Sequence, residues 1–140
     1  FAAHVPTLLA MFFSPWVAVC TVIGSTVGFL ISVGPIVAIR AASHIIFALV
    51  GAFMLKKKVN PYLVFVICAI LHGLGEAASV YLFGPMLGFA QSTSLSYLFG
   101  TVFGITVFHH SVDCVFTVIL AFALEKAKFL KSTGLFPKRA

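Results

Sequence analysis

The sequence predicts an all-α membrane protein, a polytopic bundle of helices that cross a lipid bilayer. Of its 140 residues, 61% are hydrophobic and only 9% are charged, and its mean hydropathy is +1.17. A soluble domain of this size needs more charged side chains than this to cover its surface. The length fits a single domain, so we expect one transmembrane domain over residues 1–140.

Long apolar stretches predict the individual spans, because about 20 mainly apolar residues are needed to cross a bilayer as a helix. A shorter apolar run precedes four long ones. This run could be the end of a spanning helix or a short helix at the membrane edge. In chain order, the expected spans are residues 5–13 (partial), 16–33, 35–55, 61–83 and 97–124.

Turn-forming residues separate these stretches. Residues 14–16 (Ser-Pro-Trp) predict the first turn, with Trp16 suited to the lipid–water interface. Residues 34–35 (Gly-Pro) predict a tight turn with a proline at the start of the next helix. A polar, lysine-containing loop fills residues 56–60, and an uncharged loop fills residues 84–96.

Positive charge is concentrated at two places in the chain, which carries a net charge of +6. Positively charged loops stay on the cytoplasmic side of a membrane. We therefore expect a multi-pass protein of the bacterial plasma membrane, with residues 56–60 and the C-terminus in the cytoplasm and residues 84–96 outside. This placement makes nucleic acid an improbable partner. The two clusters are Lys56, Lys57 and Lys58, and Lys126, Lys128, Lys131, Lys138 and Arg139.

The same orientation places the turn at residues 34–35 outside, the turn at residues 14–16 inside and Phe1 outside. A bacterial membrane protein with an outside start commonly has a preceding helix. We therefore expect six spans in the full protein, with the first absent from this sequence.

Charged and imidazole side chains fall inside the expected spans, where an unpaired charge costs several kcal/mol. At about 1.5 Å per residue, Arg40 and Glu76 reach similar depths in the outer half. His44 and His72 lie one turn deeper on the same helix faces. We expect an outward-opening cavity lined by the last three spans, where Arg40 binds an anionic group. Mutual neutralisation of Arg40 and Glu76 is the alternative. The expected substrate-binding residues are Arg40, His44, His72, Glu76, His109 and Asp113.

A metal could instead be bound, since imidazole and carboxylate are suitable ligands; the candidate ligands are His44, His72, His109, His110 and Asp113. The sequence has no HExxH-like motif, however, and the adjacent His109 and His110 point in two directions on a helix. We therefore expect no metal, no cofactor and no catalytic residue. No phosphate-binding motif for ATP is present either.

Small residues recur at helical spacing in two places. Gly24 and Gly28 form a GxxxG pattern, and Ala48 and Ala52 form an AxxxA pattern. Such pairs let two helices approach closely. Packing within the bundle is the simpler interpretation, and docking of a partner membrane protein is the alternative.

Several segments together carry a family resemblance: residues 4–10 (HVPTLLA), 14–17 (SPWV), 24–29 (GSTVGF) and 40–44 (RAASH), followed by residues 48–52. Through them the whole chain resembles the substrate-binding S components of energy-coupling factor (ECF) transporters. The resemblance implies a six-helix vitamin-binding protein with both termini in the cytoplasm and a vitamin site near the outer face. It also implies two kinds of partner, a transmembrane T component and two ATPase subunits, and therefore a transporter subunit rather than an enzyme.

The sequence is most similar to S components assigned to pantothenate, with those assigned to nicotinate next and another small vitamin as a further alternative. Both named vitamins are carboxylates, which suits Arg40. The hydroxyls and amide of pantothenate also suit an extended set of polar side chains. Two other classes stay open, an intramembrane metal-dependent enzyme that uses the histidines and a membrane scaffold protein.

Overall fold

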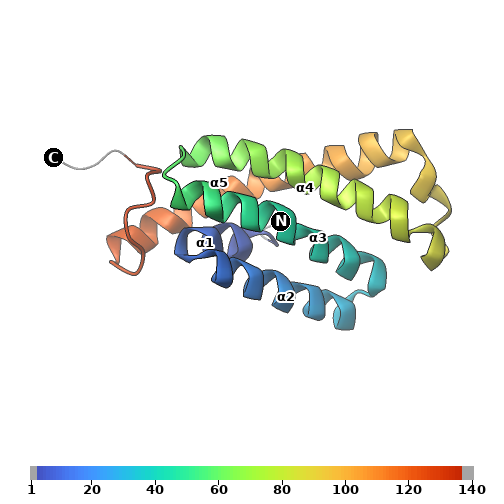
Figure 1. Cartoon of the computed structure of the whole chain (residues 1–140), viewed down its shortest axis with the longest axis horizontal. Helices are drawn as coiled ribbons and strands as arrows, with labels where there is room; N and C mark the ends of the chain where they lie inside the picture. Colours follow the sequence, from blue (N-terminus) through green and yellow to red (C-terminus); the bar gives the residue numbers. More distant parts are fainter. Residues whose placement is uncertain (1–2, 137–140) are drawn as a thin grey trace.

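Prolines and polar caps mark where the helices begin in the computed structural model, which describes residues 3–136 (Figure 1). The α-helices are α1 (Val5–Phe13), α2 (Pro15–Ser32), α3 (Pro35–Lys56), α4 (Pro61–Phe83) and α5 (Gly104–Lys126). A proline is the first residue of α2, α3 and α4, a position where its missing N–H breaks no helical hydrogen bond. These bounds lie within one or two residues of the predicted spans in the first four cases.

Side-chain caps explain two of these helix starts. The Ser14 hydroxyl accepts a hydrogen bond from the Val17 backbone N–H at 3.1 Å. The Asn60 side-chain oxygen accepts one from the Tyr62 N–H at 2.9 Å. Each cap satisfies a backbone donor that the first turn of a helix leaves unpaired.

The last span is longer and less regular than predicted. A π-helical segment, η3 (Ser96–Phe103), runs directly into α5, so the continuous helical stretch covers Ser96–Lys126. Two short 3₁₀ turns, η1 (Pro85–Leu87) and η2 (Ala90–Thr93), occupy the loop that precedes it. Hydropathy alone does not distinguish π-helical from α-helical backbone, because the mean hydropathy of a stretch does not depend on its number of residues per turn.

Four helical stretches are long and apolar enough to cross a bilayer: α2, α3, α4 and the stretch Ser96–Lys126. No strand occurs among residues 3–136. This confirms the predicted all-α, polytopic membrane class. At about 1.5 Å per residue, α1 is roughly 14 Å long, about half of the hydrocarbon thickness of a bilayer.

Helix α1 lies inside the bundle rather than at its edge. Its residues Leu8 and Met11 belong to the main hydrophobic core, together with Phe47 of α3, Val64 and Cys68 of α4. It contacts α2, α3 and α5. The residues just before α1 are thereby held near the middle of the bundle. This placement brings His4 into the cluster of ionisable side chains described below.

The two ends of the bundle differ in charge. Figure 1 shows the α3–α4 turn and the C-terminal segment at one end, and the α2–α3 turn and residues 84–96 at the other. Lys56 and Lys131 line one cavity at the first end, so one lysine of each cluster lies there, as the charge pattern predicted. Which end faces the cytoplasm stays a prediction. Phe1, Lys138 and Arg139 lie outside the described residues.

The two small-residue pairs have different surroundings. Ala48 and Ala52 are 0% and 2% exposed and belong to the core, so they pack within the chain and cannot contact a partner in this arrangement. Gly24 and Gly28 are exposed on α2, with no atom within 4 Å of an added Cβ. Only the glycine pair is therefore left as a candidate docking surface.

Candidate functional site

Three helices and the segment before α1 bring ionisable side chains together at the centre of the bundle. Each helix contributes a pair at i, i+4 spacing, which places both side chains on one face. These pairs are Arg40 and His44 of α3, His72 and Glu76 of α4, and His109 and Asp113 of α5; His4 and His110 join them. All six predicted site residues thus meet in one cluster.

Glu76 lies in the second half of α4, on the side of this cluster away from the lysine end, and is held from several directions. The Arg40 Nε and Nη2 groups donate hydrogen bonds to Glu76 Oε2 at 3.2 and 2.5 Å. The Thr106 hydroxyl donates to the same oxygen at 2.6 Å. The Glu76 side chain is 7% exposed and that of Arg40 is 35% exposed. The matching depths predicted for Arg40 and Glu76 are confirmed by this ion pair.

The other carboxylate oxygen of Glu76 faces two imidazoles. Glu76 Oε1 lies 3.2 Å from His44 Nε2 and 3.4 Å from His72 Nε2. The two imidazole nitrogens are 3.0 Å from each other. On its far side, His72 Nδ1 lies 2.9 Å from His110 Nδ1.

Asp113 forms a second acidic centre deeper in the bundle, where it is fully buried. Its Oδ2 atom accepts a hydrogen bond from the His4 backbone N–H at 3.0 Å and lies 2.9 Å from His4 Nδ1. His109 Nε2 is 3.2 Å from the same oxygen. The His4 ring connects the two acidic centres, since its centroid is 4.4 Å from that of His72 and 4.8 Å from that of His44.

A cavity of about 260 Å³ adjoins the cluster. It is lined by residues of α3, α4 and α5, as predicted, and also by Phe29 of α2 and by the segment before α1. It lies toward the end of the bundle away from the lysines, because its α3 residues come from the first half of that helix. Its lining residues are Ala3, His4, Phe29, Val37, Arg40, Ala41, His44, Glu76, Ile105, Thr106 and His109.

The guanidinium of Arg40 can hold an anion in this cavity without releasing Glu76. A guanidinium carries five N–H donors. Two of them bind Glu76 Oε2, so three have no partner among the described residues. These three donors, on a side chain that lines the cavity, are suited to a planar carboxylate.

Three residues of the site were not predicted. His4 precedes the first helix, and its contact with Asp113 spans 109 residues of sequence. Thr106 has an uncharged side chain in an apolar stretch. His110 was considered as a possible metal ligand but not as a substrate-binding residue, and it contacts His72. His4 is the residue directly before α1, and no helical spacing in the sequence links it to the other members of the cluster.

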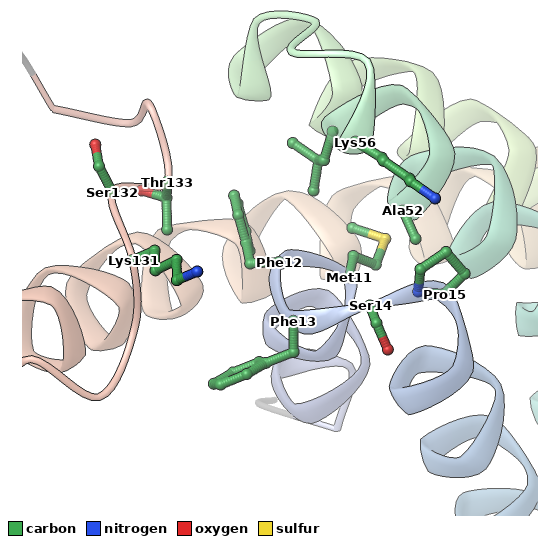
Figure 2. A pocket seen from close by; sticks show the side chains of 11 residues that line it. Met11, Phe12, Phe13, Ser14, Pro15, Ala52, Lys56, Lys131, Ser132 and Thr133 are labelled. Carbon is green, nitrogen blue, oxygen red and sulfur yellow. The ribbon is translucent and has the colours of Figure 1, made fainter.

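A second cavity, of about 320 Å³, lies at the lysine end (Figure 2). It surrounds the α1–α2 turn, with Lys56 on one side and Lys131, Ser132 and Thr133 of the C-terminal segment on the other. Both lysines are exposed, and no member of the buried histidine cluster lines this cavity. It lacks the buried polar side chains that give a small-molecule site its specificity.

Comparison with known proteins finds a similar protein, the niacin transporter NiaX of Lactococcus lactis subsp. cremoris (strain MG1363). The two sequences are 37% identical over 137 residues, which cover 90% of this chain and 61% of NiaX. The chain therefore spans about three fifths of the length of this relative. No protein-family model matches the chain, and no solved structure matches it.

Proposed function

We propose that this chain is the membrane-embedded substrate-binding part of a niacin uptake transporter, related to the S components of ECF transporters, and that Arg40 binds the carboxylate of nicotinate. The similarity to a niacin transporter supports the transported vitamin. The observation that carries the site is the Arg40 guanidinium. It lines a cavity beside the buried Glu76 and keeps donors for a second carboxylate.

Niacin replaces pantothenate as the preferred vitamin. The relative is named for niacin, and nicotinate was the alternative favoured by its carboxylate. The cavity of about 260 Å³ is smaller than the roughly 300–1,000 Å³ of sites for drug-sized ligands. A small, flat, aromatic acid is compatible with such a volume.

The cavity also offers apolar contacts for the pyridine ring of nicotinate. Phe29, Val37 and Ile105 are among the residues that line it. An aromatic ring gains from edge or offset contact with phenylalanine in addition to the burial of its surface. The proposed orientation therefore has the carboxylate on Arg40 and the ring toward these three side chains.

Uptake against a gradient needs an energy source, and the sequence carries no ATP-binding motif. We therefore infer that the chain works with a transmembrane partner and two ATPase subunits, as the ECF resemblance implies. The exposed Gly24 and Gly28 on α2 are the proposed docking surface, because they leave room for a neighbouring helix to approach. We propose that the lysine end of the bundle is cytoplasmic, as the positive charge predicts, so that the cavity opens to the outside.

Calorimetric titration of the purified protein in lipid nanodiscs with a panel of vitamins tests the proposal. Nicotinate should bind with a single site, and pantothenate should bind at least tenfold more weakly. Thermal stabilisation by the same vitamins gives an independent reading, because a ligand that binds only the folded state raises its stability. Tighter binding of pantothenate, or no binding of nicotinate to a folded preparation, would contradict the proposed vitamin.

A further inference from the structure

Three potential ligand atoms form a tight triangle at the centre of the bundle. His44 Nε2, His72 Nε2 and Glu76 Oε1 are separated by 3.0, 3.2 and 3.4 Å. All three side chains are buried. They come from two different helices, so the triangle is a product of tertiary packing.

Hydrogen bonds alone leave one short contact in this triangle unexplained. A ring nitrogen of histidine carries either one proton or one lone pair in the plane of the ring, and so makes one good hydrogen bond at a time. If both imidazole nitrogens donate to Glu76 Oε1, their two N–H groups are left 3.0 Å apart with no acceptor between them. One cation between the three atoms would accept a lone pair from each and satisfy them together.

The size of the triangle matches one face of a tetrahedral metal site. Zinc binds histidine nitrogen and carboxylate oxygen at about 2.0–2.2 Å in tetrahedral geometry. Neighbouring ligand atoms in such a tetrahedron are about 3.3–3.6 Å apart, from the same bond lengths. The observed separations of 3.0–3.4 Å are close to this value.

His4 supplies the fourth corner. One ligand atom each from His4, His44, His72 and Glu76 lie within 4.8 Å of one another, and all four residues are buried. The set consists of three imidazoles and one carboxylate, a combination suited to zinc and to neighbouring first-row divalent ions. Four protein ligands would close the coordination shell, as in structural zinc sites.

The surrounding residues resemble the outer shell of a metal site. A metal-binding histidine usually gives its other ring nitrogen to a carboxylate or another acceptor, which fixes the ring. His4 Nδ1 lies 2.9 Å from Asp113, and His72 Nδ1 lies 2.9 Å from His110. The second oxygen of Glu76 accepts hydrogen bonds from Arg40 and Thr106.

We propose that His4, His44, His72 and Glu76 bind one divalent transition-metal ion of the zinc class, which fastens the segment before α1 to α3 and α4. Because His4, His44 and Glu76 also line the cavity, the ion would fix one wall of it. The inference does not depend on which molecule the protein transports.

The first test uses the wild-type chain, purified with a tag free of histidine. After zinc loading and dialysis, elemental analysis should find about one zinc per chain. X-ray absorption at the zinc edge should show imidazole-type nitrogen and one oxygen at about 2.0–2.2 Å. No retained zinc, or an octahedral shell made mostly of water, would overturn the proposal.

Variants then locate the ion. His72→Ala should lower zinc affinity at least a hundredfold, and His110→Ala about 10- to 100-fold through the outer shell. His109→Ala is the matched control, because His109 also lies in the cluster but belongs to a different candidate group, with His4 and Asp113. Loss of zinc in His109→Ala with retention in His72→Ala would overturn the assignment.

A titration with Co²⁺ uses only the wild-type protein, so its result does not depend on whether a variant folds. The wild-type protein should develop the intense visible bands of tetrahedral Co²⁺, and zinc should displace them at one equivalent. Weak bands of octahedral Co²⁺ would contradict four protein ligands. Nicotinate binding, measured on the same preparation, reports separately on the proposed function.

Discussion

Replacing Arg40 by alanine tests how the cavity recognises its ligand. In the structure two of the five guanidinium donors hold Glu76 and three are left for a ligand. Loss of a charge-assisted hydrogen bond costs about 1.5–3 kcal/mol, which corresponds to roughly a 10- to 100-fold loss of affinity. Arg40→Ala should weaken nicotinate binding by at least this factor. Arg40→Lys should not restore it fully, because an ammonium lacks the planar fork.

The same change affects stability, so the two effects must be separated. Removing one partner of a buried ion pair costs about 3–5 kcal/mol. The cost here should be smaller, because the Arg40 side chain is 35% exposed and Glu76 keeps its bond from Thr106. The double variant Arg40→Ala/Glu76→Gln removes both charges. It should recover part of the thermal stability without recovering nicotinate affinity.

Calorimetry in nanodiscs with nicotinate and nicotinamide gives the readout. Nicotinamide has the same ring without the carboxylate, so Arg40→Ala should change its affinity much less than that of nicotinate. Lys57→Ala, at the opposite end of the bundle, is the control for a general loss of positive charge. If Arg40→Ala folds normally and binds nicotinate with unchanged affinity, Arg40 is structural and the carboxylate argument fails.

Three further predictions test topology, docking and packing. In a background without native cysteines, an impermeant thiol reagent added outside should label Ser94→Cys but not Lys57→Cys; the reverse pattern would invert the proposed orientation. Gly28→Leu should reduce co-purification with the transmembrane partner while nicotinate binding stays intact, and loss of both together would point to misfolding instead. Gly73→Ala places a Cβ 2.6 Å from the Phe103 ring of η3, so it should lower the free energy of unfolding by about 1–3 kcal/mol and lower the unfolding midpoint. Gly100→Ala, which has open space around it, is the control and should have little effect. Equal shifts in the two variants would refute the packing argument.

Hydropathy and helical spacing were sufficient to predict much of this molecule. The apolar stretches gave the spans, because a bilayer sets the length of a helix that crosses it. The i, i+4 spacing of Arg40 with His44, and of His72 with Glu76, predicted that the two side chains of each pair lie on one face of their helix. The count from each helix end gave the matching depth of Arg40 and Glu76, which form the ion pair.

Contacts that depend on tertiary packing could not be predicted in this way. The position of His4 is set by where α1 packs against α3 and α5, and no local pattern records it. The burial of Ala48 and Ala52 follows from which face of α3 turns inward, since small-residue spacing is the same for internal and external packing. The triangle of His44, His72 and Glu76 depends on the relative placement of two helices.

The proposed contact between the nicotinate carboxylate and Arg40 can be tested directly by solid-state NMR. Nicotinate labelled with ¹³C at its carboxylate would be bound to protein that carries ¹⁵N-labelled arginine in lipid bilayers. Bidentate contact at about 2.7–2.9 Å between nitrogen and oxygen puts the carboxylate carbon within roughly 5 Å of a guanidinium nitrogen. We predict strong dipolar dephasing of the carboxylate signal, lost in Arg40→Gln at ligand concentrations that keep the site filled. Bound nicotinate without dephasing, or dephasing that persists in Arg40→Gln, would contradict the account.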